Sequence, residues 1–277
     1  MAVVALASLA GSPGVTTAAA ALAVHWRRPV VLIEADTSAA STMMAGFFRA
    51  NLRTTEGGIE KLAYALAREV LEPEDILNPE LALAIAVHTL PPIPSMPIPS
   101  IPAQHQMWVV PGFVNLGVVE GVRSLWTKLP RLFAALGEGG IDVILDLGHL
   151  QVDDPRLPLL DAADKVLICA SASSIDLNRA YRRLELPDLA QRVRTMSGER
   201  YWSLLTAPVA TELPASAFTD HILPVVATLP HDPEGAAVFS HGRPDSKPGR
   251  NRYRGAVRRA AQDLRVMIEP TENRNVS

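Results

Sequence analysis

The chain has 277 residues, of which 48% are hydrophobic, and its formal net charge is −3 at pH 7. This composition is enough for a large buried core, and the charge balance argues against a protein held on nucleic acid by bulk positive charge. The single cysteine, Cys169, excludes an intrachain disulfide and a zinc site built from cysteines. Together these features predict a cytoplasmic globular protein.

Residues 2–36 form a predicted strand, turn, helix and strand. The apolar run 2–10 is typical of a buried strand, and the turn "GSPG" follows it. The alanine-rich run 15–26 predicts a helix, and Thr16 and Thr17 at its start offer hydroxyls that can cap free backbone amides. The run 30–36 predicts a second strand that ends in an acid. Such a unit places its two strands parallel, with a right-handed crossover.

The same N-terminal stretch must be weighed as a targeting or membrane segment. It lacks the basic start of a signal peptide, and "GSPG" with two threonines interrupts its apolar run. We therefore expect neither a signal peptide nor a membrane span.

Strands and helices continue to alternate along the rest of the chain. The patterns predict helices at 59–71, 124–140, 174–186 and 253–267, and strands at 107–112, 141–148, 163–171, 201–208 and 224–230. This alternation predicts an α/β protein with a doubly wound, mostly parallel sheet and helices on both faces. We expect one domain over residues 1–269 and a flexible tail at 270–277.

A proline-rich segment, residues 90–106, stands apart from this alternation. Its prolines disfavour helix and central strand and favour extended polyproline geometry. The simpler interpretation is a stiff surface loop between two elements of the domain. The alternative is a ligand for a partner that reads proline-rich segments.

The first turn has the composition of an anion site. Backbone amides and the positive end of a helix attract phosphate, and glycines allow the close approach of backbone to ligand. The turn supplies Gly11 and Gly14, and Thr16 or Thr17 could provide a hydroxyl for magnesium. The usual phosphate loop carries lysine directly before that hydroxyl residue, where this chain has Val15.

With the other motifs taken in order, the chain resembles the ParA/MinD family of dimeric P-loop ATPases, which position chromosomes, plasmids, division sites and other cell machinery. The deviant Walker A pattern of that family, K-G-G-x-G-K-[ST]-[ST], lies over "AGSPGVTT" without a gap. The family's D-x-D strand resembles "VLIEAD", and its Walker B strand resembles "IDVILDLG". Its "aD" pair falls on Asp164, and its "iPxD" motif falls on Pro230 and Asp232.

The resemblance implies ATP or ADP with Mg²⁺ as cofactor and assigns roles to particular residues. Asp36 would be catalytic by orienting the attacking water, whereas Glu34 stands one methylene longer than the family's aspartate. Thr16 and Asp146 would hold the magnesium ion. The implied nucleotide-binding residues are Gly11, Ser12, Pro13, Gly14, Val15, Thr16, Thr17, Gly148, Pro230 and Asp232.

Two departures from the family bear on catalysis. Ala10 stands in place of the signature lysine, which reaches the partner's phosphates across the dimer, and Val15 stands in place of the P-loop lysine. Phosphoryl transfer depends on positioning and electrostatic stabilisation, so the loss of both cations predicts weak or absent hydrolysis.

Three functions remain open from the sequence. The first is a nucleotide-binding positioning or partitioning factor with a degenerate loop. The second is an active ATPase, and the third is a nucleotide-free interaction scaffold. The resemblance implies a homodimer with an unknown protein partner or cargo.

The basic run 250–266 predicts a final helix with a small apolar face and an arginine-rich side. The simpler interpretation is a helix packed on the sheet with a solvated basic side. The alternative is non-specific contact with DNA or a membrane surface, which would place the protein at the periphery of the nucleoid or membrane.

Overall fold

The computed structural model describes residues 1–11, 14–48, 58–69, 71–87, 101, 104–207, 213–245 and 247–269. Ser12 and Pro13 of the predicted phosphate loop, most of the proline-rich segment and the predicted tail lie outside these residues.

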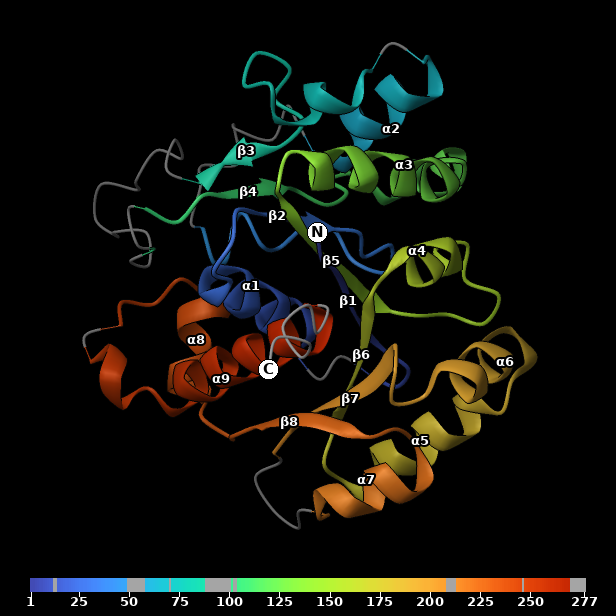
Figure 1. Ribbon diagram of the computed structural model, residues 1–277, viewed down its shortest axis with the longest axis vertical. Coiled ribbons are helices and arrows are strands. Elements are labelled where there is room, and N and C mark those ends of the chain that lie inside the picture. Colours follow the sequence, from blue (N-terminus) through green and yellow to red (C-terminus); the bar gives the residue numbers. More distant parts are fainter. Residues whose placement is uncertain are drawn as a thin grey trace, which may run out of the picture.

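The described part of the chain contains an eight-stranded sheet with the order β3-β4-β2-β5-β1-β6-β7-β8 (Figure 1). The strands are β1 Val3–Ser8, β2 Val30–Glu34, β3 Ile85–Ala86, β4 Met107–Val110, β5 Asp142–His149, β6 Lys165–Ser171, β7 Tyr201–Thr206 and β8 Val225–Leu229. Every pairing is parallel except that of the short edge strand β3 with β4. The predicted mostly parallel sheet is therefore confirmed.

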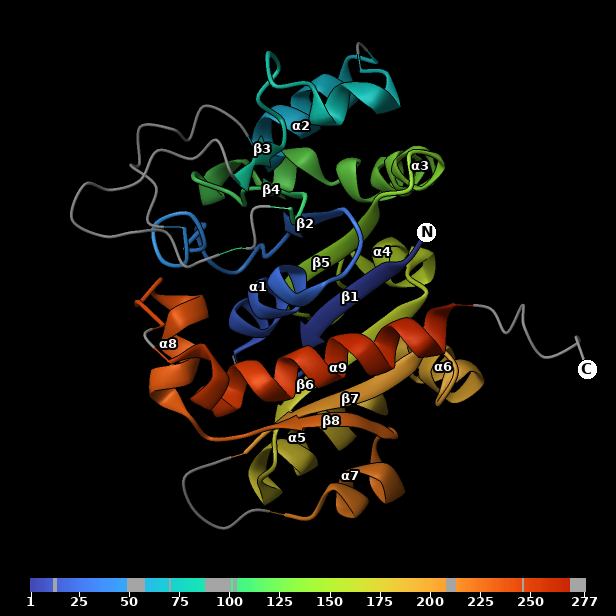
Figure 2. The ribbon, with the colours of Figure 1, turned by 60° about the vertical axis from the view of Figure 1, so that its left-hand side comes forward.

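Helices cover both faces of this sheet, as predicted (Figures 1 and 2). On one face lie α1, α8 and α9, with α9 running along β8. The helices are α1 Val15–His25, α2 Ile59–Ala67, α3 Leu125–Glu138, α4 Leu157–Ala162, α5 Ser174–Leu184, α6 Pro187–Met196, α7 Ala215–His221, α8 Pro233–Ser240 and α9 Arg252–Ile268. Within the described ranges, no helix is long and apolar enough to cross a membrane.

Successive residues of β1 face two different apolar cores. Val4 and Leu6 pack into the cluster beneath α1, α8 and α9, while Val3, Ala5 and Ala7 pack into the cluster beneath α3 and α4. A strand that is buried on both faces has a continuous apolar sequence, and this is why the apolar run 2–10 predicted β1.

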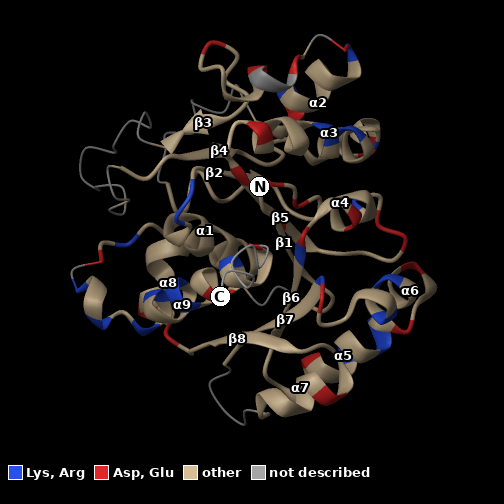
Figure 3. Ribbon diagram, in the orientation of Figure 1, with Lys and Arg blue, Asp and Glu red and all other residues tan. Residues whose placement is uncertain are grey.

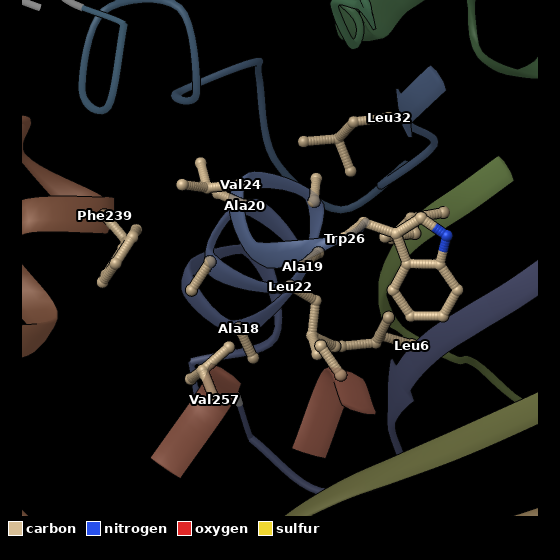
Figure 4. Close-up of a cluster of buried hydrophobic side chains, with 14 of the residues drawn as sticks. Leu6, Ala18, Ala19, Ala20, Leu22, Val24, Trp26, Leu32, Phe239 and Val257 are labelled. Carbon is tan, nitrogen blue, oxygen red and sulfur yellow. The ribbon is translucent and has the colours of Figure 1, made fainter. Parts of the chain in front are cut away.

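The alanines of α1 allow it to lie close to the sheet and to α8 and α9 at once (Figure 4). Every residue from Ala18 to Val24 is buried. Figure 4 shows Leu6 and Leu32 of the sheet, Phe239 of α8 and Val257 of α9 around this helix. Small side chains on all sides are needed for such an enclosed helix, because larger ones would overfill the space.

Two acids fix the amino ends of the central strands. Asp142 accepts hydrogen bonds from the Ala2 amide and from the Trp26 indole nitrogen, both at 2.8 Å. Asp164 accepts from the Val3 amide at 2.8 Å. These acids lie at the edge of the sheet opposite the carboxyl ends, so their roles are structural.

Candidate functional site

The loop between β1 and α1 has open space beside both of its described glycines. Gly11 and Gly14 have φ values of 65° and 79°, in the left-handed region, and a Cβ on either would meet nothing within 4 Å. The Ser8 hydroxyl donates to the Gly11 carbonyl at 2.8 Å. Gly14 is the N-cap of α1, and no side chain caps the helix, so the expected capping by Thr16 or Thr17 is wrong. The first-turn amides are left for an anion.

The two positions where the resemblance expects lysine carry buried apolar side chains. Ala10 is 9% exposed and Val15 is 3% exposed. The Val15 side chain belongs to the core cluster that α1 shares with α8 and α9. The loop therefore attracts an anion through backbone dipoles, without help from a cation at either position.

Acids from β2 and β5 lie side by side at the carboxyl end of the sheet. Glu34 and Asp146 are register partners in this parallel pair. Asp146 is fully buried, and its Oδ1 accepts from the Gly148 amide at 3.1 Å. Burial, followed by the charge of Glu34, raises the pKa of Asp146 to about 7, although hydrogen bonding from Thr16 and Gly148 opposes the shift.

The second oxygen of Asp146 is suited to a magnesium site. Asp146 Oδ2 has no well-formed hydrogen bond among the described residues, and the Thr16 hydroxyl lies close enough to favour the charged carboxylate. A carboxylate beside a hydroxyl provides the hard oxygen donors that Mg²⁺ prefers. No cage of three or more acid, histidine or cysteine side chains forms in the described residues, so waters or phosphate oxygens would complete the coordination. The residues present fit the ion.

Glu34 has a structural role at this site. It is 4% exposed, and its carboxylate accepts hydrogen bonds from the Ser41 hydroxyl, the Thr42 amide at 3.2 Å and the Gly112 amide at 3.0 Å. These bonds tie the segment after β2 to the segment after β4. The additional methylene of glutamate thus reaches two neighbouring loops.

Asp36 lies directly over Gly148. Its Oδ1 accepts from the Ser38 amide at 2.8 Å and from the Ser38 hydroxyl at 2.6 Å. A Cβ built on Gly148 would lie less than 3.0 Å from the Asp36 carboxylate, closer than real Cβ contacts allow. The chain thus brings together Asp36, Asp146, Gly148 and Thr16 as the resemblance implies.

A buried arginine behind these acids was not predicted from the sequence. Arg156 is fully buried and binds both carboxylate oxygens of Asp154, at 2.8 and 2.7 Å. Its other guanidinium bonds go to the carbonyls of Ala35 at 2.9 Å, His149 at 2.7 Å and Leu147. Arg156 therefore fixes the backbone next to Asp36 and Asp146. An isolated arginine beside a proline carries no motif, so only its burial identifies it.

A hollow of about 290 Å³ adjoins the loop between β1 and α1. Gly14 and Thr17 line it together with Pro230 and Asp232 of the segment after β8. Asp232 also caps α8 by accepting from the Gly235 amide at 2.9 Å. No lysine or arginine is among the described residues that line this hollow. Its size suits a small planar group such as a nucleobase.

Comparisons with known proteins support the same architecture. No family model and no curated protein matches the chain. Among solved structures, MinD from Pyrococcus horikoshii OT3 complexed with Mg-ADP has a TM-score of 0.63 and 17% identity, covering 95% of each chain. A ParA family ATPase from Chlorobium tepidum TLS has a TM-score of 0.66 and 13% identity, covering 95% of this chain and 98% of its own.

A third structure, McdA from Cyanothece complexed with ATP, has a TM-score of 0.61 and 17% identity. It covers 95% of this chain and 96% of its own. The chain therefore has the fold of the ParA/MinD ATPases over nearly its whole length. The resemblance drawn from the sequence motifs is confirmed at the level of the fold.

Proposed function

We propose that this protein is a ParA/MinD-like nucleotide-binding factor that positions or partitions other cell components, with weak or no ATP hydrolysis. The observation that carries the proposal is the meeting of Thr16, Asp36 and Asp146 beside the open loop at Gly11 and Gly14. Parallel α/β sheets bind their ligands at this carboxyl edge.

The proposed ligand is ATP or ADP with Mg²⁺. Loop amides would contact the phosphates, Thr16 and Asp146 would hold the ion, and the hollow at Thr17, Pro230 and Asp232 would receive the base. Bound magnesium would supply positive charge to the phosphates. The solved relatives complexed with Mg-ADP and with ATP share this fold, which supports the choice of nucleotide.

Weak hydrolysis follows from the residues at the two lysine positions. Val15 and Ala10 are apolar and buried, so neither can neutralise charge on a transferring phosphoryl group. Loss of one preorganised electrostatic contact typically lowers kcat by about 10²–10³-fold. We therefore propose that the protein acts by binding nucleotide, with little turnover.

Thermal stability measured against Mg-ATP concentration tests the proposal. A ligand that binds the native state adds RT ln(1 + [L]/Kd) to its stability, so Tm should rise with Mg-ATP in wild type. The rise should be lost in Thr16→Ala, which removes the hydroxyl next to Asp146. The matched control is Thr127→Ala on α3, whose hydroxyl bonds only within its own helix turn. A flat wild-type titration would favour the nucleotide-free scaffold instead.

An active ATPase is the second candidate, and the position of Asp36 over Gly148 favours it. This candidate predicts magnesium-dependent phosphate release that Asp36→Ala abolishes while leaving Mg-ATP binding in place. Phosphate release that does not respond to Asp36→Ala would argue against turnover at this site.

The proposed partners follow from the fold and the charge pattern. MinD from Aquifex aeolicus has been solved in a complex with MinC, which supports a partner-binding role for a protein of this fold, and the homodimer rests on the family resemblance alone. We propose a cytoplasmic location, with DNA or membrane phosphates as further contacts of the basic final helix.

A further inference from the structure

A second hollow, of about 700 Å³, lies between the end of β8 and the start of α9. It shares Ala207, Pro230 and His231 with the hollow described above, so the two adjoin. Its volume falls within the range of small-molecule sites, about 300–1,000 Å³. From the sequence, two interpretations of this region were open: the solvated basic side of a final helix, or non-specific contact with DNA or a membrane surface.

The lining of this second hollow is strongly basic. It includes Arg250 of the short 3₁₀ helix Pro248–Arg250, Arg252 in the first turn of α9, and Arg258 and Arg259. No acidic side chain is among the described residues that line it. Figure 3 shows the basic residues gathered along the α8–α9 connection and the start of α9.

None of these four arginines makes an ion pair with another described residue. Two acids in adjoining segments are engaged elsewhere. Asp245 binds Arg254 at 2.7 Å and Asn251 at 3.3 Å, and Asp232 caps α8. Among the described residues, the lining of this hollow therefore holds four arginines and no acid, and Arg250 alone of them also lines a neighbouring hollow with Glu234 and Asp245.

The helix itself adds to the positive potential and leaves room for a ligand. Arg252 lies in the first turn of α9, where the helix dipole disfavours a cation. Gly255 lines the hollow in the middle of a helix turn, and its missing Cβ leaves the Arg259 guanidinium 3.8 Å from that position. A bound anion would relieve both the mutual repulsion of the arginines and the opposition of the dipole.

We propose that this second hollow binds the phosphate groups of a small polyphosphorylated anion. Guanidinium groups bind phosphate oxygens in pairs of parallel hydrogen bonds, and the four here form no ion pair with another described residue. The site goes beyond the proposed function, because its arginines belong to neither the phosphate loop nor the acidic cluster of Asp36 and Asp146. The positive charge absent from the phosphate loop is thus present in a hollow that adjoins the one lined by Gly14 and Thr17.

Calorimetric titration with inorganic tripolyphosphate in EDTA tests this site without magnesium. The wild type should bind, and Arg258→Gln/Arg259→Gln should bind about tenfold more weakly or worse, since hydrogen bonds to charged groups are strong contributors. The matched control, Arg131→Gln/Arg194→Gln, removes the same charge from exposed positions on α3 and α6. Its affinity should stay within about twofold of wild type, because exposed charges at long range are screened.

Thr16→Ala separates this site from the proposed nucleotide site. Tripolyphosphate binding should be unchanged in Thr16→Ala, even if Mg-ATP binding is lost there or never observed. Equal weakening in the two arginine pairs would overturn the proposal, because it would show an effect of net charge alone. Tighter binding of a short duplex DNA than of tripolyphosphate, with the same dependence on Arg258 and Arg259, would also overturn it in favour of a nucleic-acid surface.

Discussion

The carboxylate of Asp36 lies over the backbone of Gly148, where no side chain could fit. Gly148 has a φ of 56°, so it is both left-handed and in close contact with its neighbour. Asp36 follows the end of β2 by two residues and Gly148 is the penultimate residue of β5, and these two strands pair in parallel register. Glycine at this position therefore sets where the Asp36 carboxylate lies relative to Asp146.

Gly148→Ala should lower the free energy of unfolding by about 2–4 kcal/mol. About 1–2 kcal/mol arises from the left-handed conformation, and the rest from displacement of Asp36. In an Asp36→Ala background the same substitution should cost only the conformational part. Urea denaturation of the four proteins of this double-mutant cycle measures the coupling. Additive effects would mean that the two side chains do not compete for the same space.

Asp146→Asn should raise stability in EDTA at pH 8 by up to about 4 kcal/mol, at 1.36 kcal/mol per pKa unit. Burial and Glu34 raise the pKa of Asp146 to about 7 from 3.8, so the folded state holds its proton more tightly than the unfolded state. The contribution of Asp146 to wild-type stability should therefore fall as pH rises from about 4 through about 7. Asparagine retains the acceptor for the Gly148 amide without the charge. An unchanged or lower stability of Asp146→Asn at pH 8 would contradict the prediction that the buried charge of Asp146 destabilises the folded state.

Local pattern was sufficient to predict the first strand–helix–strand unit, but the order of the strands required the whole fold. The continuous apolar runs of β1 and β2 and the alanines of α1 identify each element by itself. β5 lies between β1 and β2, and it pairs with residues more than a hundred positions away in the sequence. A short stretch of sequence contains no information on such a pairing. The polar helices α6 and α7 and the two-residue strand β3 were not predicted, because their apolar faces are too small or too short.

The candidate site divides in the same way. Asp36, Asp146 and Gly148 were identified because motif order places them at the carboxyl ends of strands. The structural role of Glu34 was not predicted, because it depends on hydrogen bonds from Ser41 and Gly112, which lie in two different loops. Contacts between distant segments decide such roles, and sequence spacing alone does not contain them.

The contribution of His25 to stability should fall as pH decreases from about 6.5 to about 4, opposite in sign to the contribution of Asp146. Burial, followed by the charges of Arg254 and Arg258, lowers the pKa of His25 to about 4 from 6.5. The unfolded state therefore takes up a proton in this window that the folded state excludes, at a cost of about 3 kcal/mol. His25→Gln should remove this contribution, so its stability relative to wild type should rise as pH decreases from about 6.5 to about 4, measured by urea denaturation at half-unit intervals. The exposed His221→Gln should keep the wild-type profile, and an identical profile in His25→Gln would refute the assignment.

Arg156→Met should lower the free energy of unfolding by about 3–5 kcal/mol, because it leaves Asp154 charged and buried without its partner. It also removes the donors for the carbonyls of Ala35 and His149. The matched control is Arg192→Met, which breaks the half-exposed pair with Asp161 and should cost less than about 1 kcal/mol. Guanidinium chloride denaturation compares them, and similar losses would show that burial of Arg156 contributes little.

Val15→Lys should destabilise the protein without nucleotide yet increase its response to Mg-ATP. The valine is packed among the buried residues of α1, so a longer chain should cost about 1–3 kcal/mol and lower Tm. Its aliphatic stem can replace the valine while the ammonium extends toward the loop, where a phosphate would bind it. The rise in Tm with Mg-ATP should then exceed that of wild type. The control is Val15→Met, whose side chain has similar length and no charge. It should show the lower Tm without a larger response to Mg-ATP. An equal response to Mg-ATP in the two variants would mean that position 15 does not face a phosphate site.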